Sequence, residues 1–249
     1  MAVVVGSKHV IHFRHHSKAK KKVKVRPSKT LYLIGKRLFD IVVSLLVIAL
    51  ILSWLVPILA LLIRLDSRGP VFFVQTRVGF LGCRFRCYKL RTMVVNSESD
   101  SKQALNNDSR ITRLGYFLRV TSLDELPQFL NVLMGSMSIV GPRPFMVKDD
   151  QAFSIVVSNY PFRYCAKPGI TGMAQIKGYR GPTASFNSIF HRYQWDTFYI
   201  RNAGISLDLK IIRSTFRQTI KSILSFKYAE QKNEVIPINT RQLVLENIH

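Results

Sequence analysis

Two adjacent acids, Asp124 and Glu125, stand in a chain that is otherwise strongly basic. Such a pair can be a helix cap beside a solvated acid, or it can bind magnesium and supply a nucleophile among phosphate-binding cations. A helix capped by Ser122 would carry Pro127 at its fifth position, where the missing N–H is costly. A helix capped by Asp124 holds Pro127 in its first turn, where proline is tolerated. We therefore predict Asp124 as an ionised N-cap, while the residues alone leave the catalytic role open.

Cations that could bind a diphosphate lie upstream of the acids. Residues 71–75 are predicted to form one short strand and residues 85–93 a second one. Alternation in the second strand places Lys89 and Arg91 on the same face. Two neighbouring cations suit a diphosphate, but a solvated strand face would show the same pattern, so both interpretations stay open.

The longest apolar segment covers residues 41–63, which carry no charged side chain. At helical rise it spans about 34 Å, enough for the hydrocarbon core of a bilayer. Pro57 predicts a kink inside the segment. Basic residues flank both ends, Lys36 and Arg37 before it and Arg64 after it, and such flanks favour the cytoplasmic side. The pattern therefore fits either a helix that bends at Pro57 and returns to the same face or a simple span.

The formal charge of +23 is unevenly distributed along the chain. Eleven of the 37 Lys and Arg residues precede residue 38, where there is no acid, so we expect an extended basic arm. Anionic lipid and nucleic acid are the partners that such an arm could attract. The hydrophobic content of 47% excludes wholesale disorder, and three cysteines do not suggest a disulfide framework, which fits the cytosol.

A second apolar pattern lies near the C-terminus. The helical stripe consists of Leu209, Ile212, Phe216, Ile220 and Ile223. Lysines and arginines flank it, which is typical of a helix on a membrane surface. Packing of the same stripe against the domain is the alternative.

Several ordered motifs resemble the bacterial sugar transferases, the monotopic phosphoglycosyl transferase family of polyprenyl-phosphate sugar-1-phosphate transferases. The longest are Ser-Leu-Asp-Glu-Leu-Pro-Gln at 122–128 and Met-Ser-Ile-Val-Gly-Pro-Arg-Pro at 137–144. The others lie at 36–40, 66–70, 77–79, 89–93, 131–133, 168–172 and 207–210. The resemblance covers roughly residues 36–213.

The resemblance implies a mainly helical α+β fold: a monotopic membrane protein with one Pro-kinked re-entrant helix and a small cytoplasmic catalytic domain with short strands. The expected segments are a disordered or membrane-surface arm at 1–35, the re-entrant helix at 36–65, the catalytic domain at 66–226 and a tail at 227–249. One departure is that Val56 precedes the kinking Pro57 where the family commonly has serine.

The resemblance also assigns roles to residues. Asp124 matches the nucleophile and Glu125 its catalytic partner, and together they serve a Mg²⁺ site. The implied substrate-binding residues are Lys89, Arg91, Arg119, Pro142, Arg143, Pro144 and Asp196. Pro57 is the membrane kink.

The implied reaction transfers a sugar-1-phosphate from a UDP-sugar to polyprenyl (undecaprenyl) phosphate. It releases UMP through a covalent aspartyl phosphosugar and initiates polysaccharide or glycoconjugate synthesis. The expected location is the bacterial inner membrane, with the catalytic domain on the cytoplasmic face, phospholipid as a partner and no nucleic acid. The alternative is a membrane-tethered nucleic-acid-binding protein. The sugar, the pathway, a homodimer and the roles of the arm and tail are left open.

Overall fold

The computed structural model describes residues 28–96, 103–104, 108–181 and 185–231. Most of the predicted basic arm and residues 232–249 of the predicted tail lie outside the described residues. The element order is mainly helical with two small sheets, which confirms the α+β class.

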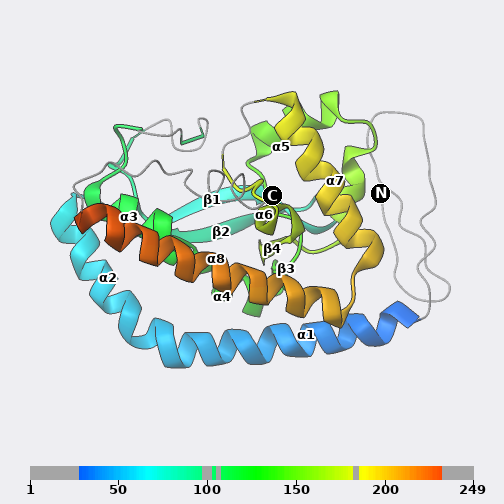
Figure 1. Cartoon of the computed structure of the whole chain (residues 1–249), viewed down its shortest axis with the longest axis horizontal. Coiled ribbons are helices and arrows are strands. Elements are labelled where there is room, and N and C mark those ends of the chain that lie inside the picture. The colour runs from blue at the N-terminus through cyan, green and yellow to red at the C-terminus, as the bar shows by residue number, and fades with distance from the viewer. Residues whose placement is uncertain (1–27, 97–102, 105–107, 182–184, 232–249) are drawn as a thin grey trace.

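The N-terminal apolar segment forms one long bent helix. Its parts are α1 (Ser28–Val47), the π-helical segment η1 (Ile48–Leu52) and α2 (Ser53–Asp66). Figure 1 shows α2 turned away from the direction of α1, so the bend lies where η1 meets α2, about one turn before Pro57. A proline removes one backbone hydrogen bond and clashes with the preceding turn, and a π-helical turn relieves such a mismatch.

Side chains near the bend bond to carbonyls in or next to η1. The hydroxyl of Ser53 donates to the carbonyl of Ala49 at 2.6 Å, and the indole N–H of Trp54 donates to the carbonyl of Leu50 at 2.8 Å. The serine thus bonds to η1 rather than to a carbonyl beside Pro57. These bonds keep the backbone of the bend satisfied where water is scarce.

The long helix is a candidate membrane segment over Thr30–Asp66, and only 17% of its most apolar window is buried by the protein. Such extensive exposure of apolar side chains is typical of a surface that lipid covers. Helix α1 begins at Ser28, and the expected division between arm and re-entrant helix at residue 36 stays a prediction. The additional N-terminal turns are stabilised by contacts with the domain, because Tyr32 donates to Asp208 at 2.8 Å.

Polar contacts attach α1 to the domain. Lys36 forms an ion pair with Asp208 at 2.8 Å, and the guanidinium of Arg37 donates to two carbonyls at the end of α4 (Gln128–Leu133). The buried carboxylate of Asp40 accepts a hydrogen bond from the backbone N–H of Ile139 at 3.1 Å. The helix is therefore fixed to the domain along one side, where Val43, Leu59 and Ile63 also pack, while many of its other apolar side chains are exposed.

Two short sheets support the site. Strand β1 (Phe72–Val78) pairs antiparallel with β2 (Arg84–Leu90), and β3 (Ser138–Val140) pairs parallel with β4 (Gly169–Thr171). Strands β1 and β2 confirm the two predicted strands, but β1 continues to Val78 instead of ending at residue 75, and β2 ends at Leu90 instead of residue 93. Beyond Leu90 the backbone leaves β1 and pairs with residues 110–112.

The remaining elements are helices and turns. They are η2 (Phe80–Gly82), α3 (Arg113–Thr121), η3 (Leu123–Glu125), α5 (Val147–Val156), η4 (Tyr160–Cys165), α6 (Met173–Ile176), α7 (Phe186–Asn202) and α8 (Ile205–Gln231). The largest buried apolar cluster lies between the strands, α4, α7 and α8, with Val132, Met137 and Ile211 at its centre.

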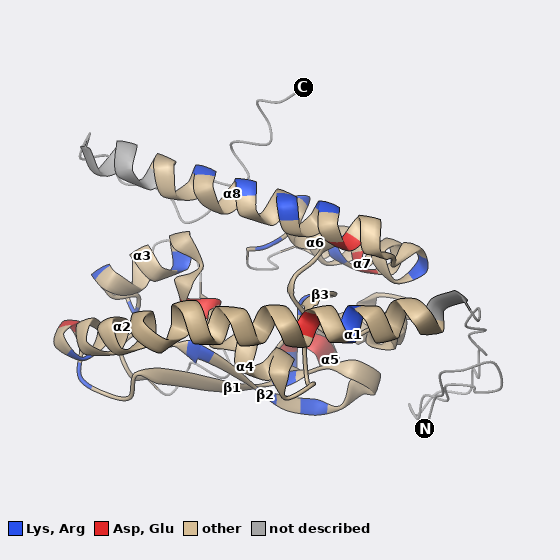
Figure 2. Cartoon of the chain, turned by 90° about the horizontal axis from the view of Figure 1, so that it is seen from below, with Lys and Arg blue, Asp and Glu red and all other residues tan. Residues whose placement is uncertain are grey.

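Helix α8 lies along the opposite side of α3 from the β1–β2 sheet, well separated from α2 (Figure 2). It continues to Gln231, and the expected division between domain and tail at residue 226 stays a prediction. Leu209, Phe216 and Ile220 of the predicted stripe are exposed, whereas Ile211 between them is buried. The alternative prediction, that the stripe packs against the domain, is therefore wrong for Leu209, Phe216 and Ile220.

Candidate active site

The two acids lie in a short 3₁₀ turn between helices. Helix α3 ends at Thr121 because Ser122 adopts the left-handed conformation, with φ of 65°, and η3 follows directly. The predicted N-cap is wrong: Asp124 lies inside η3, and Pro127 is the residue that precedes α4. After the left-handed Ser122 the backbone forms 3₁₀ bonds, from the N–H of Glu125 to the carbonyl of Ser122 and from that of Leu126 to Leu123, and the next α-helix begins only after Pro127. Both carboxylates are buried, with 7% of Asp124 and 5% of Glu125 exposed.

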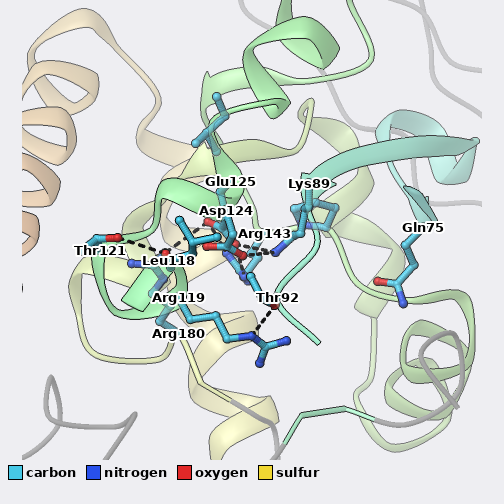
Figure 3. Close-up of polar contacts among 12 residues, drawn as sticks. Gln75, Lys89, Thr92, Leu118, Arg119, Thr121, Asp124, Glu125, Arg143 and Arg180 are labelled. Carbon is cyan, nitrogen blue, oxygen red and sulfur yellow. Dashed lines mark hydrogen bonds and ion pairs between the residues drawn. The ribbon is translucent and has the colours of Figure 1, made fainter. Parts of the chain in front are cut away.

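Three cations surround the carboxylate of Glu125 (Figure 3). Lys89 Nζ and Arg143 Nη2 each lie 2.7 Å from Oε1, and Arg180 Nη2 lies 3.2 Å from Oε2. Burial on its own would raise the pKa of Glu125, but Arg143, Lys89 and Arg180 outweigh it and hold that pKa well below its usual range. Glu125 is therefore an ionised carboxylate that fixes three cationic side chains.

Asp124 has fewer bonding partners than Glu125. Its carboxylate lies 3.8 Å from Lys89 Nζ, and within the described residues no hydrogen-bond donor reaches it. Burial raises the pKa of Asp124, Lys89 opposes this rise, and the charge of Glu125 adds to it. Arg119 also acts on Asp124 electrostatically while its Nε donates to Thr92 Oγ1 at 2.8 Å. A desolvated, weakly bonded carboxylate in a cationic site has the properties of a nucleophile.

Arg143 is placed by the backbone on either side of it. The carbonyl of Pro142 accepts from the N–H of Gly169 at 2.9 Å, and the carbonyl of Pro144 accepts from Arg77 at 2.7 Å. The carbonyl of Arg143 itself accepts from Arg163 Nη2 at 2.6 Å. The two prolines therefore lie beside the site and hold the loop that points the Arg143 guanidinium at Glu125.

Asp196 lies behind the site. It is 1% exposed and forms an ion pair with Arg163 at 3.0 Å, while Arg163 stacks on the ring of Phe145 at 4.4 Å. Burial raises the pKa of Asp196, and Arg163 opposes that rise. The structure thus connects Asp196 to the site through Arg163 and the Arg143 backbone, and does not bring it to the two acids.

Arg91 is also placed away from the acids. Its guanidinium donates to the carbonyls of Ile63, Ser67 and Arg68, at the end of α2. Because β2 ends at Leu90, the predicted alternation no longer holds at residue 91. The structure therefore brings Lys89 to the acids and uses Arg91 to attach the end of the long helix.

Two functional candidates were missed from the sequence. Arg180 contacts Glu125, and Arg163 holds the Arg143 carbonyl. Arg180 lies between Gly178 and Gly181, and an arginine in a glycine-flanked turn was a signal that could have been used. Nothing in the sequence around Arg163 marks it.

The acids fit a magnesium ion in part. Mg²⁺ is usually held by one or two carboxylates together with substrate phosphates. Asp124 offers such a carboxylate, whereas both oxygens of Glu125 already contact cations. No group of three His, Cys, Asp or Glu side chains in the described part of the chain could form a complete protein site. The donor set fits an ion that the substrate helps to bind.

The comparisons with known proteins identify the family of the chain. The family model described as bacterial sugar transferase matches residues 31–222, and the chain therefore belongs to that family. The match includes the long helix, the two acids and most of α8. Family membership favours the transferase over the nucleic-acid-binding alternative.

Several curated proteins are similar to this chain. One is a UDP-glucose:undecaprenyl-phosphate glucose-1-phosphate transferase of Klebsiella pneumoniae, 46% identical over 188 residues, or 75% of this chain and 40% of that protein. A protein of the same name from Caulobacter vibrioides is 44% identical over 72% of this chain and 67% of its own length. The exopolysaccharide production protein PSS of Rhizobium leguminosarum is 43% identical over 74% of this chain and 94% of its own length. The chain thus spans about two fifths of the Klebsiella protein and nearly all of the Rhizobium protein.

Proposed function

We propose that this protein transfers a sugar-1-phosphate from a UDP-sugar to undecaprenyl phosphate, releases UMP and initiates exopolysaccharide synthesis. The observation that carries the proposal is the site itself. A buried, weakly bonded Asp124 lies beside a Glu125 that is surrounded by cations, in a domain attached to a long apolar helix. The names of the similar proteins support the same reaction.

The proposed first step is attack by a carboxylate oxygen of Asp124 on the sugar-bearing phosphorus of the donor. The new bond joins Asp124 to that phosphorus, and the bond to the bridging oxygen breaks, so UMP leaves with that oxygen. In the second step an oxygen of the lipid phosphate attacks the same phosphorus and displaces Asp124. A covalent intermediate lets a water-soluble donor and a membrane lipid use the same carboxylate in turn.

The cations of the site supply charge neutralisation. Attack by an anion on a phosphate ester is slow unless positive charge offsets the repulsion. Lys89, Arg143 and Arg180 are already fixed by Glu125, so little reorganisation is needed when the diphosphate arrives. Asp124 must be ionised to attack, and Lys89 favours that state.

We propose that Asp124 and the donor diphosphate together hold Mg²⁺. The ion would neutralise phosphate oxygens and the departing UMP. Glu125 keeps its three cations in this scheme and acts on the metal site only through its charge.

The membrane arrangement is part of the proposal. We expect the long helix to enter and leave the same face, because basic residues flank both ends and the helix is bent near Pro57. The exposed face of α8, with Phe216 and Ile220, would then rest on phospholipid. The domain would lie on the cytoplasmic face of the bacterial inner membrane. Formation of a homodimer stays a prediction.

Incubation of membranes with donor, Mg²⁺ and undecaprenyl phosphate tests the reaction. UDP-glucose is the first donor to use, because glucose appears in the names of the Klebsiella and Caulobacter relatives. We expect release of UMP that depends on the lipid acceptor over repeated turnovers. Absence of UMP with every donor tried would refute the proposed reaction.

Single-cysteine labelling tests the topology. The three native cysteines, Cys83, Cys87 and Cys165, are free thiols and would first be replaced. New cysteines at positions 34 and 68 should then react with an impermeant reagent from the same side of the membrane. Reaction from opposite sides would establish a simple span and leave the proposed chemistry unaffected.

A further inference from the structure

Glu125 and Arg180 line one part of a pocket whose other residues have no role in the mechanism described so far. Three parts of the chain form its walls: η3 and the start of α4, then β4 and α6, and finally α8. The pocket has a volume of about 460 Å³, part of which is open to solvent. Hydroxyl and amide groups of Ser122, Gln175 and Thr215 line it together with the apolar side chains of Leu126 and Phe129. A mixture of apolar surface with a few polar groups is typical of a small-molecule site.

Helix α8 presents an unusual face to this pocket. Thr215 and Gln218 face inward and line it, while Phe216 and Ile220 of the same turns are exposed. A helix that only packs on a domain places its apolar side chains inward. Both polar side chains have partners within the protein: Thr215 Oγ1 lies 2.6 Å from Thr171 Oγ1 and donates to the carbonyl of Ile211, and Gln218 Nε2 donates to the carbonyl of Ile176 at 2.8 Å. They make this wall of the pocket polar, and the atoms that lack a partner in the described part of the chain belong to other residues.

Two buried polar atoms in the pocket have no hydrogen-bond partner within the described residues, Gln175 Oε1 and Ser122 Oγ. Gln175 is 6% exposed, and its Nε2 donates to the carbonyl of Ile170 at 3.1 Å. That bond fixes the orientation of the amide, because a flipped amide would place two acceptor oxygens together. Buried polar atoms nearly always have partners, so an orphaned acceptor indicates a ligand that donates a hydrogen bond.

The class of ligand that could donate this hydrogen bond can be narrowed by comparing the parts of the two substrates. Ionised phosphate oxygens and an isoprenoid chain offer no donor to Gln175 Oε1, whereas sugar hydroxyls do. The pocket also adjoins the nucleophile closely, because Ser122 and Glu125 lie on either side of Asp124 in the chain. The sugar ring is one ester bond from the phosphorus that Asp124 attacks, while the nucleoside lies beyond the second phosphate.

We propose that this pocket binds the sugar ring of the donor, and that Gln175 and Ser122 determine specificity by bonding to its hydroxyl groups. The proposal rests on the proposed transferase function and adds to it the site that distinguishes one UDP-sugar from another. It gives a role to the two buried polar atoms that have no partner within the described residues.

The test is a comparison of binding and turnover for full-length variants in detergent or lipid discs. UDP-glucose, UDP-galactose and UDP-N-acetylgalactosamine are measured against UDP, which lacks the sugar. We expect Gln175→Met to lower affinity and kcat/KM for the preferred UDP-sugar about tenfold, as loss of one buried hydrogen bond does, with affinity for UDP unchanged. Ser122→Gly, which suits the left-handed backbone, should act in the same direction. Gln194→Met, on an exposed part of α7 where Gln194 contacts His191, is the matched control and should change neither.

The outcomes separate this proposal from the function on which it rests. Equal losses for the UDP-sugar and for UDP would overturn it, since they indicate a nucleotide site or a damaged fold. A change confined to the KM of undecaprenyl phosphate would overturn it in favour of an acceptor site. Absence of UMP release would refute the transferase reaction, whereas a preference for UDP-sugar over UDP that Gln175→Met removes would still support the pocket.

Discussion

Two ionic clusters lie next to one another at Arg143 and differ in net charge. The site cluster comprises the acids Asp124 and Glu125 with the cations Lys89, Arg119, Arg143 and Arg180. The support cluster comprises the acids Asp150 and Asp196 with the cations Arg163 and Arg192. Arg163 donates to the Arg143 carbonyl, and the charge of Arg143 adds to the effect of burial in lowering the pKa of Arg192. The site cluster has more cations than acids, whereas the support cluster is balanced.

This difference separates a binding site from a scaffold. An excess of buried positive charge is costly unless an anion arrives, so the site cluster is suited to a diphosphate. In the support cluster Arg163 forms ion pairs with both acids beneath the rings of Phe145 and Tyr160, although Asp150 Oδ1, Arg163 Nε and Arg192 Nε have no hydrogen-bond partner within the described residues. We expect this cluster to act on catalysis through the position of Arg143.

Asp124→Asn is the change with the largest expected effect. Loss of the nucleophile should reduce UMP release by at least about 10³-fold and abolish covalent labelling by a UDP-sugar carrying ³²P on its sugar-bearing phosphate. Folding should be retained, because burial disfavours the ionised carboxylate that the substitution removes. Labelling that persisted in this variant would place the nucleophile elsewhere.

Asp196→Asn should separate the support cluster from the site cluster. It leaves Arg163 with a weakened partner, and breaking a buried ion pair costs about 3–5 kcal/mol of stability. Thermal unfolding in detergent should show this loss, whereas Asp66→Asn, at an exposed residue, should change stability by less than about 0.5 kcal/mol. A variant with unchanged stability but no donor binding would instead make Asp196 a substrate ligand.

The sequence was sufficient for features that depend on local composition. The long apolar helix, the β1–β2 pair and the acids could all be recognised from runs or short spacings. The ion pairs of Glu125 could not be recognised in this way. Its partners Lys89, Arg143 and Arg180 lie 36, 18 and 55 residues away in the sequence and meet it only in the folded domain. Arg91 is a residue for which a local pattern misled the prediction. Strand alternation placed it on the same face as Lys89, but β2 ends at Leu90 and Arg91 instead donates to the carbonyl of Ser67.

A matched pair of arginine substitutions sharpens the charge comparison. Arg180→Gln removes one cation from the site cluster, so KM for the UDP-sugar should rise about tenfold and depend less on salt. Arg192→Gln removes a buried cation from the support cluster and should lower stability with a smaller change in KM. Equal effects of the two changes on KM would contradict the division into site and scaffold.

The pH dependence gives the smallest effect and the most direct view of Asp124. Burial raises the pKa of Asp124 and Lys89 lowers it, so the acid limb of kcat/KM should lie above the ordinary aspartate range. Lys89→Met removes the opposing charge, raises the pKa further and should move the limb to higher pH. Glu125 cannot produce this limb, because its pKa lies well below the usual range and it stays ionised as the pH falls. A limb that did not move in Lys89→Met would show that another group controls the activity, and Asp124 would lose its electrostatic link to Lys89.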